Sequence, residues 1–420
     1  MQQPDFRTIN RFRGEYFKEV VPKVFAEVIT LLICEGYLAS EDYFLDGTKL
    51  AADAYKHSAV WKKNTQRYKE LVQARAKEIL KEVEAVNQKE DQELGEKNLP
   101  ECGEEAVITS EKLKAVADGI NKALEGKARG AEEKRLKKCG KKLEQEAQKL
   151  ELYETQEQLL GERNSYSKTD PDATFMRMKN DELRAGYNVQ LGSQDGFIAG
   201  CSVHQNANDG ATLLQHLQER TEQGLPSIER GVTDAGYGNE QNYAELEAQG
   251  VEAYLKYPDF SRDVKDSHPP YHYSRFAYDL ATNSFTCPEG RQLRFQHSEE
   301  RKQTSGFKYQ VEVYECESCA GCPFHAACVK GPGNRRIHYN RRLQAHKQKA
   351  RERLTSPLGV ALCRQRGNAC ESLFGDLKHN QGVGRFRLRG LPKVRLEAML
   401  WSISYNLRKL FGMEVKPKLA

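Results

Sequence analysis

The chain has 420 residues, of which 30% are charged and 38% hydrophobic, and a formal net charge of +5 at pH 7. This length allows two or three domains with a substantial core. The mean hydropathy is −0.76, and no apolar run reaches the roughly 18 residues that a membrane span needs. Charged residues recur from Asp5 to Arg13, where a signal peptide would have its apolar core. We expect a cytoplasmic protein with no membrane partner.

The positive charge is concentrated at one end of the chain. From Lys330 to Ala420 there are 21 Lys and Arg residues against five Asp and Glu residues. Such an excess predicts a polyanion as partner, and nucleic acid is the default candidate. A basic tail that only aids solubility is the alternative.

The first half of the chain is predicted to be mainly helical. Residues 1–40 carry apolar side chains at spacings of three and four, which predicts a helical region. The sequence opens as if in the middle of a helical domain, so we interpret this region as the end of a DNA-binding domain. Residues 41–60 hold a strand that runs into Asp46-Gly47, where we expect it to end in a tight turn. Residues 61–165 are rich in Lys, Glu, Gln and Ala, with breaks at residues 99–103 and 126–140. They predict an inserted helical hairpin or short coiled coil, with a partly disordered linker as the alternative.

The residue pattern of residues 166–257 predicts a sheet with short helices. Residues 186–192 and 197–204 predict a β-hairpin with Asp195-Gly196 at its turn, and Asn208-Asp209 is expected to cap the following helix. A short strand then ends at Asp234, and a helix and another strand follow it. For Asp53, Asp195 and Asp209 we favour turn or cap roles.

A third acidic residue lies in the basic C-terminal region, at residues 346–420. Residues 368–380 predict a helix that places Glu371, Phe374 and Lys378 on one stripe. Taken alone, a Glu and a Lys on one helix face usually form only a solvated surface. The order is strand with Asp46, hairpin, helix, strand with Asp234, helix, strand and helix with Glu371. This order predicts an α/β fold, namely a ribonuclease-H-like mixed sheet with a long helical insertion and a Cys-rich insertion at residues 258–345.

Two Asp and one Glu that converge on one point would supply hard oxygen ligands. Mg²⁺ or Mn²⁺ prefers such ligands and completes its shell with water and substrate phosphate. A two-metal site of this kind activates a water or a 3′-hydroxyl for in-line displacement at phosphorus. The sequence therefore predicts that Asp46, Asp234 and Glu371 hold catalytic metals beside a basic surface that holds DNA.

These motifs together resemble the DDE transposases of bacterial insertion sequences, in the branch with a Tyr-x2-Arg-x3-Glu-x6-Lys signature. Glu371 and Lys378 match the second half of that signature, whereas Arg364 and Gly367 stand at the Tyr and Arg positions. Residues 45–49 resemble the first-Asp motif and residues 233–237 the second. Residues 384–390 resemble the Arg-rich segment that follows the Glu helix in many relatives. The resemblance covers most of the chain but lacks much of the usual N-terminal region for binding transposon ends.

The resemblance implies hydrolytic nicking at transposon ends and attack of the freed 3′-hydroxyl on target DNA. It implies double-stranded DNA as partner, both transposon ends and target, and a homodimer on DNA. It assigns a phosphate contact to Lys378, and Arg364 or Arg366 is a candidate for another. The Arg-rich segment adds Arg385, Arg387 and Arg389 to the expected DNA-binding residues.

Five of the 11 cysteines are clustered, and the other six are scattered and expected to pack as small apolar residues. The Cys-x2-Cys spacing lets two thiolates reach one tetrahedral Zn²⁺. We expect a structural zinc site formed by Cys316, Cys319 and Cys328 with Cys287 or Cys322, and His325 and His338 are further candidate ligands. A set of reduced thiols without metal is the alternative.

Three other functions are compatible with parts of the sequence. One is a catalytically inactive or truncated transposase remnant that acts as a DNA-binding protein. Another is a related nuclease that cuts without joining. The third, a zinc-ribbon regulator, would leave the three acids unexplained.

Overall fold

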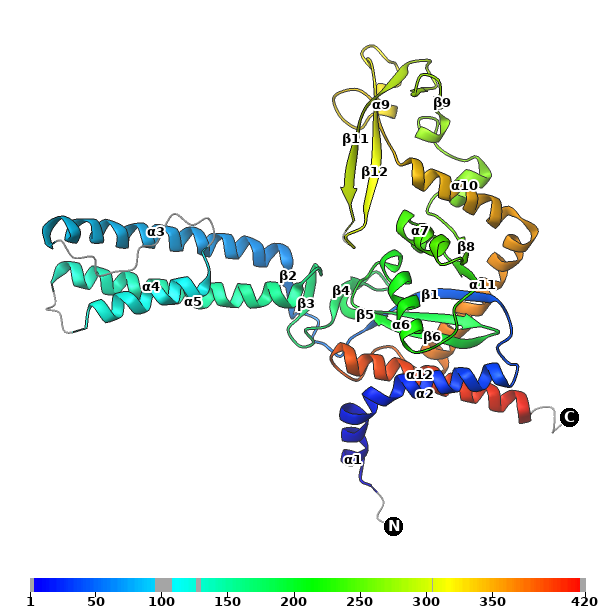
Figure 1. The fold of residues 1–420 in the computed structure, drawn as a ribbon, viewed down its shortest axis with the longest axis horizontal. Coiled ribbons are helices and arrows are strands. Elements are labelled where there is room, and N and C mark those ends of the chain that lie inside the picture. Colours follow the sequence, from blue (N-terminus) through cyan, green and yellow to red (C-terminus); the bar gives the residue numbers. More distant parts are fainter. Residues whose placement is uncertain (1–3, 95–107, 126–129, 304, 416–420) are drawn as a thin grey trace. The chain divides into compact units, whose positions relative to one another are not determined.

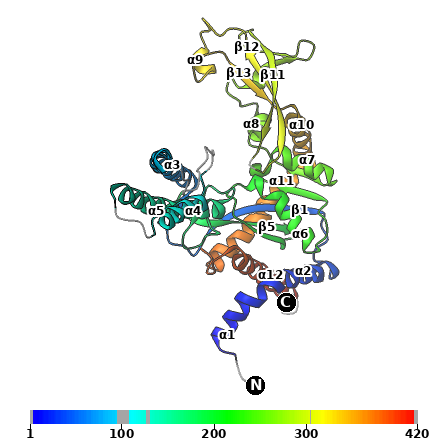
Figure 2. The same cartoon turned by 60° about the vertical axis from the view of Figure 1, so that its left-hand side comes forward.

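The chain separates into two compact units (Figures 1 and 2). The computed structural model describes residues 4–94, 108–125, 130–303 and 305–415. The core unit comprises Met1–Ala52, Met178–Asn180 and Gly186–Ala420, and the helical unit comprises Asp53–Arg177 and Asp181–Ala185. The helical unit is thus inserted into the sequence of the core unit, between its first and second strands.

Most of the described part of residues 1–40 is helical, as predicted. It forms α1 (Phe6–Arg11), a π-helical turn (Phe12–Phe17) and α2 (Lys18–Cys34). The buried residues of α2 recur every three or four positions and form one apolar stripe, which consists of Val21, Phe25, Ile29 and Leu32. Helix α2 packs against the last helix, α12 (Leu391–Val415).

The core unit is built on a mixed sheet, which confirms the predicted α/β class. Its strands have the order β6-β5-β1-β7-β8. Strand β5 pairs antiparallel with both β6 and β1, whereas β1, β7 and β8 are parallel. A sixth strand, β4 (Thr174–Arg177), pairs with β5, whose first residues belong to the helical unit. The bounds of the other strands are β1 Asp42–Ala51, β5 Leu183–Gln194, β6 Phe197–His204, β7 Arg230–Thr233 and β8 Glu252–Leu255.

The predicted β5–β6 hairpin is confirmed, with a two-residue turn. Asp195 and Gly196 both have positive φ, 51° and 76°, as a type I′ turn requires. The Asp195 carboxylate also accepts hydrogen bonds from the backbone N–H groups of Ala39 and Ser40, each at 2.9 Å. Asp195 is therefore a turn residue, as expected.

The predicted turn at Asp46-Gly47 is wrong, because β1 continues through both residues to Ala51 and pairs with β5 throughout. The glycine serves a different purpose. A Cβ atom on Gly47 would lie 2.6 Å from Oδ1 of Asp209 and closer still to Nε2 of Gln190. Gly47 is thus required for space inside the sheet.

Helices cover the strands that carry the predicted acids. Helix α11 (Pro357–Gly375) packs against β1 and β7, and α12 packs against β6. Helix α6 also contacts β6, and α7 and α10 contact β8. The bounds of these three helices are α6 Leu213–Glu222, α7 Glu240–Ala248 and α10 Arg341–Thr355. Among the helices of the described ranges, none has both the length and the apolar character to cross a bilayer.

The Cys-rich region of the core unit forms a second sheet, with strand order β13-β12-β11-β10-β9. Its neighbouring strands are antiparallel, and β11 and β12 form the long ribbon seen in Figure 1. The strand bounds are β9 Ala277–Asp279, β10 Ser284–Thr286, β11 Gln292–Lys302, β12 Lys308–Cys316 and β13 Arg336–Tyr339. The short helix α8 (Phe260–Lys265) precedes these strands in the sequence, and α9 (His325–Cys328) lies between β12 and β13.

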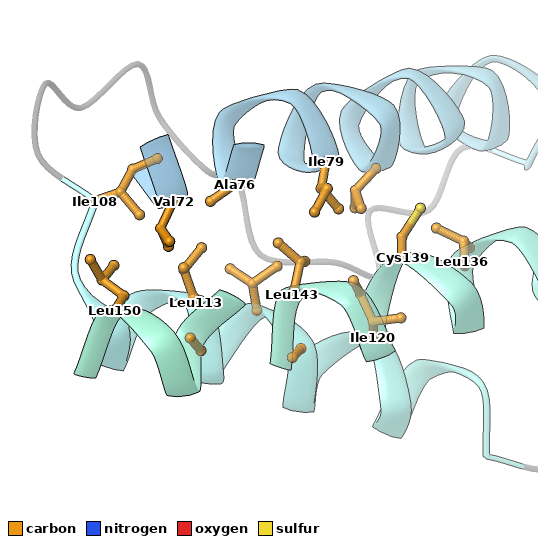
Figure 3. Close-up of a cluster of buried hydrophobic side chains, with 14 of the residues drawn as sticks. Val72, Ala76, Ile79, Ile108, Leu113, Ile120, Leu136, Cys139, Leu143 and Leu150 are labelled. Atoms are coloured by element: carbon orange, nitrogen blue, oxygen red, sulfur yellow. The ribbon is translucent and has the colours of Figure 1, made fainter. Parts of the chain in front are cut away.

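In its described residues the helical unit has three long helices and not the predicted hairpin: α3 (Lys62–Leu94), α4 (Ser110–Ala123) and α5 (Ala131–Leu160). Their facing sides share an apolar core that includes Val72, Ile120 and Leu143 (Figure 3). This core also argues against a disordered linker for the described helices. The break predicted at residues 126–140 is confirmed at its start, because α4 ends at Ala123 and α5 begins at Ala131, but α5 then continues through Gly140. The break at residues 99–103 lies outside the described residues.

The two ends of the helical unit are joined by a short ladder. Strand β2 (Ala59–Trp61) pairs antiparallel with β3 (Ser165–Ser167), with Ala59 opposite Ser167. The chain therefore enters and leaves the three helices through two paired strands.

The scattered cysteines follow the prediction in part. Cys139, Cys201 and Cys370 are buried and Cys363 is half-buried, but Cys34 is exposed. Cys102 lies outside the described residues. The buried thiols pack as small apolar groups, as expected.

We expect Leu143→Ala to lower the free energy of unfolding of the helical unit by about 2–5 kcal/mol, because it leaves a cavity in a closed core. Leu143 is fully buried, whereas Leu152 on the same helix is 54% exposed. Leu152→Ala is therefore the matched control and should change stability little. Urea unfolding followed by Trp61 fluorescence in a Trp401→Phe background measures both variants. Equal effects of the two substitutions would contradict the three-helix core.

Candidate active site

Strand pairing brings two of the predicted acids side by side. Strands β1 and β7 are parallel, and their last paired residues are Phe44 and Val232. Extending this register by two residues places Asp46 level with Asp234, on neighbouring strands. Because β7 ends at Thr233 while β1 continues, Asp234 lies where the chain leaves the sheet.

The Asp46 carboxylate is partly buried. Its Oδ1 accepts a hydrogen bond from the Gly47 N–H at 2.9 Å, and its Oδ2 lies 3.4 Å from the guanidinium of Arg366 on α11. Burial raises the pKa of Asp46 to about 6, and the charges of Asp234 and Asp209 push it in the same direction. The Arg366 cation opposes these effects without cancelling them. Asp46 is therefore a carboxylate whose ionised form is disfavoured mainly by burial.

Asp234 is the first residue after β7 and caps a one-turn 3₁₀ helix, Ala235–Tyr237. Its Oδ1 accepts a hydrogen bond from the Gly236 N–H at 2.8 Å. This bond fixes the carboxylate at the end of the strand, as the sequence predicts, and the other oxygen atom remains for a further ligand.

Asp209 is a fourth acid that the sequence analysis assigned wrongly to a helix cap. The cap is made by Asn208, whose side chain accepts from the Gly210 N–H. The Asp209 carboxylate instead accepts hydrogen bonds from Asn188 Nδ2 at 2.7 Å and Gln190 Nε2 at 3.0 Å. The alternation of Asn188 and Gln190 on β5 is the signal that could have revealed this, because both amides point to one side of a buried strand.

The amides of β5 extend this contact into a buried polar network. Gln190 also accepts a hydrogen bond from the hydroxyl of Tyr237, which follows Asp234 by three residues. The side chains of Asn188, Gln190 and Tyr237 are fully buried. Burial raises the pKa of Tyr237 well above its ordinary value, and the nearby charges of Asp209, Asp46 and Asp234 add to this effect. The network thus links Asp209 to the segment that positions Asp234.

Glu371 lies on α11 as predicted, but its side chain is exposed. The preceding residue, Cys370, is buried, and its pKa is raised to about 12 by burial and further by the charges of Asp46, Asp234 and Glu371. This thiol therefore lies within electrostatic reach of all three acids. Glu371 is not among the main charges that act on Asp46.

Lys378 reaches β1 from the end of the same helix. Helix α11 ends at Gly375 and continues as a π-helical turn, Asp376–Asn380. The Lys378 Nζ donates to Thr48 Oγ1 at 2.5 Å, and Thr48 is two residues beyond Asp46 on the same strand face. Burial lowers the pKa of Lys378, as does the nearby Lys179.

The predicted Arg-rich segment lies beside the end of β1. Phe386 donates its N–H to the Ala51 carbonyl at 2.9 Å, and its ring is buried against Tyr187 and Trp401. The flanking side chains Arg385, Arg387 and Arg389 are exposed. One buried aromatic residue therefore anchors a segment that presents three cations on the surface.

The two arginines of α11 have different surroundings. Arg364 is exposed, whereas Arg366 is largely buried against Asp46. Both are predicted candidates for a phosphate contact, and of the two only Arg364 lies on an open surface. Arg366 instead supplies the nearest cation to the first acid.

The carboxylate oxygens are of the type that Mg²⁺ or Mn²⁺ prefers. Burial raises the pKa of Asp46, and the charges of Asp234 and Asp209 add to this effect. A divalent cation would offset these effects, so the donor set suits one. Across the described ranges, however, no three His, Cys, Asp or Glu side chains are arranged to hold one metal ion. In the present side-chain positions Asp234 lies near Asp46, whereas Glu371 is not among the main charges that act on Asp46.

The five clustered cysteines form a separate group. Cys287, Cys316, Cys319, Cys322 and Cys328 line one small cavity of the second sheet. None of the acids described above lines it. The predicted candidate His338 does not line it either.

We expect Asp46→Asn to stabilise the metal-free core unit at pH 8 by up to about 3 kcal/mol, since the pKa of Asp46 rises from 3.8 to about 6 on folding. The protonated carboxyl is the form that the fold favours, so its contribution is complete below pH 3.8 and is lost as the pH rises through about 6. The two proteins should therefore be equally stable near pH 4. Urea unfolding with EDTA, followed by Trp401 fluorescence in a Trp61→Phe background, measures the difference. A variant less stable than the parent at pH 8 would contradict the raised pKa.

Comparison with known proteins gives one family match. Residues 286–411 match the family model described as "Transposase DDE domain". No curated protein and no solved structure matches the chain. The matched segment includes Glu371 and Lys378, and Asp46 and Asp234 precede it. The match supports the predicted resemblance to DDE-type transposases over residues 286–411.

Proposed function

We propose that this protein is a DNA transposase of the bacterial insertion-sequence type, which cuts transposon ends and joins them to target DNA in a metal-dependent reaction. The observation that carries the proposal is the register of β1 and β7. It sets Asp46 level with Asp234 on strands covered by the helix that bears Glu371. The transposase DDE match over residues 286–411 supports the same reading from independent evidence.

The order of strands supports a ribonuclease-H-like core. An antiparallel β1-β5-β6 meander is joined to parallel strands β7 and β8, with β1 in the middle of the sheet. The first acid lies on the central strand, the second at the end of its parallel neighbour, and the third on a helix that packs against both. This is the placement that the sequence order predicts for that fold.

In this proposal Asp46, Asp234 and Glu371 hold the catalytic metal. Bound Mg²⁺ or Mn²⁺ would polarise the phosphate, activate the attacking oxygen and stabilise the leaving oxygen. Metal binding would require Arg366 to release Asp46, which it contacts at 3.4 Å, and the exposed Glu371 to turn toward the two aspartates. Arg366 would then be available to contact a phosphate.

The residues around the acids would hold the DNA backbone. Arg364, Arg385, Arg387 and Arg389 are exposed, and Lys378 lies beside β1 through Thr48. Cations in such positions neutralise phosphates and hold the scissile bond in place without reading the sequence. Lys378 is the candidate for the phosphate nearest the cut, because its partner Thr48 lies on the same strand face as Asp46.

The proposed reaction needs no protein nucleophile. Water attacks the phosphorus at the transposon end, a new P–O bond forms, and the bond to the 3′ oxygen breaks, with a proton going to that oxygen. The freed 3′-hydroxyl then attacks a target phosphodiester in the same manner, and one P–O bond replaces another. A homodimer that holds two ends at once would carry out both steps.

We expect Glu371→Gln to lower Mg²⁺-dependent nicking of DNA that carries the element's own ends by at least about 100-fold. Changes to the partners of metal ligands already cost 10–100-fold. Glu352→Gln is the matched control, because Glu352 is an exposed glutamate on the neighbouring helix α10. Nicking is measured on supercoiled plasmid with Mg²⁺, Mn²⁺ or EDTA. Binding of these ends without cleavage in either metal would overturn the proposal.

We expect Asp209→Ala to slow nicking by about 10–100-fold, because the amides of Asn188 and Gln190 lose their acceptor. Asp209→Asn keeps an acceptor oxygen and should restore most of the rate. Asp195→Asn serves as the control, since that carboxylate belongs to a turn. Single-turnover nicking rates for the three variants measure the effect. Equal losses for Asn and Ala would show that the charge of Asp209 matters, against a positioning role.

A further inference from the structure

The second sheet of the core unit has few buried residues for its size. Its core cluster consists of Phe276, Phe285, Leu293, Tyr314, Cys316, Cys319 and Ile337. Along β11 only Leu293 is buried. Small cores of this kind commonly depend on a disulfide or a metal for stability. The cysteines of this sheet are free, so a disulfide does not supply the link.

The five cysteines of this region line one cavity of about 20 Å³. A single water needs about 10–15 Å³, so the space fits one small ion. Cys287 follows β10, Cys316 ends β12, and Cys328 ends the short helix α9. Segments distant in the sequence therefore bring their thiols to one place.

The thiols of Cys316 and Cys319 line the same cavity. Two thiolates on one tetrahedral Zn²⁺ are about 3.8 Å apart for a Zn–S bond of about 2.3 Å. The Cys316 thiol donates to the Ser318 carbonyl at 3.5 Å. The Cys319 Sγ also accepts a hydrogen bond from the Arg335 N–H at 3.3 Å. A backbone donor of this kind orients a sulfur ligand and stabilises its negative charge.

The structure separates four of the cysteines from the fifth. Cys316 and Cys319 belong to the core cluster of the sheet, and Cys287 and Cys328 pack against it. Cys322 is not part of that cluster. His338 does not line the cavity and receives a hydrogen bond from Arg301 at 2.8 Å. His325 lines the cavity, and its Nε2 bonds to the Gly333 carbonyl at 2.8 Å.

We propose that Cys287, Cys316, Cys319 and Cys328 bind one structural zinc ion that holds the second sheet together. As the side chains stand, no three of the described donors converge on one point, so binding requires the thiols that face the cavity to rotate toward its centre. Four thiolates fill a tetrahedral shell, and the site has no open position for catalysis. The ion links the end of β10 to the end of β12 and to α9. This inference does not depend on the proposed transposase activity.

The test is the zinc content of the untagged full-length protein, measured by mass spectrometry after purification without added metal or chelator. We expect one zinc per chain in the parent protein and loss of that zinc in Cys319→Ser and Cys287→Ser. Cys322→Ser, which removes the fifth thiol of the same cavity, and Cys34→Ser should both retain it. A metal-free parent protein, or zinc that survives Cys319→Ser, would overturn the proposal. Zinc that is lost in Cys322→Ser and retained in Cys287→Ser would overturn the ligand assignment.

A second measurement avoids variants that fail to fold. Titration of the native parent protein with a mercurial reagent should release its zinc in proportion to four modified thiols, followed with a metal-sensitive dye. Cobalt exchanged into the site should give the charge-transfer absorption of thiolate ligands in the near ultraviolet. Cobalt that binds without that band would exclude the cysteines as ligands.

Discussion

The repulsion between carboxylates is the constraint around which the candidate site is built. Parallel pairing of β1 with β7 sets Asp46 and Asp234 level with each other, and backbone hydrogen bonds keep them there. Their surroundings supply donors, namely the N–H groups of Gly47 and Gly236 and the guanidinium of Arg366. Asp209 receives two buried amides in the same way. Each donor offsets part of the negative charge, yet the pKa of Asp46 remains raised.

The same crowding explains two glycines near the acids. At Gly47 a Cβ atom would press on Asp209 and Gln190, and at Gly210 it would lie 2.8 Å from the Gly236 carbonyl. These positions let the turn that carries Asp209 approach both β1 and the segment after Asp234. The distances between the acids therefore depend on how closely these backbone segments approach each other, as well as on the side chains.

Much of the fold could be predicted from the sequence, because its signals are local. The period of two on β5 and β6, the Asp195-Gly196 turn and the apolar stripe of α2 each act over a few residues. The mistakes concern residues whose role depends on distant partners. Gly47 was interpreted as a turn residue because its crowding by Gln190 and Asp209, 143 and 162 residues away, is invisible in the sequence.

The acidic residues of the site also differ in whether their roles could be predicted from local sequence. Asp234 could be recognised from its place at the end of a strand, whereas Asp209 resembles an ordinary cap until the amides of β5 are seen beside it. The position of Arg366 against Asp46 could not be predicted either, since it depends on how α11 lies across β1. The metal role of Asp46, Asp234 and Glu371 and the zinc role of the cysteines stay predictions.

The ladder between β2 and β3 has a consequence for how the first sheet forms. Strands β1 and β5 must pair although Ala51 and Gly186 are 135 residues apart. Once Ala59 is joined to Ser167, the connection shortens to eight residues on one side and 19 on the other. The entropy lost on closing a loop rises with the logarithm of its length, so this shorter loop lowers the cost of closure by about 1.4 kcal/mol. A helical unit that folds early on its own core would thus speed the pairing of the strand that carries Asp46.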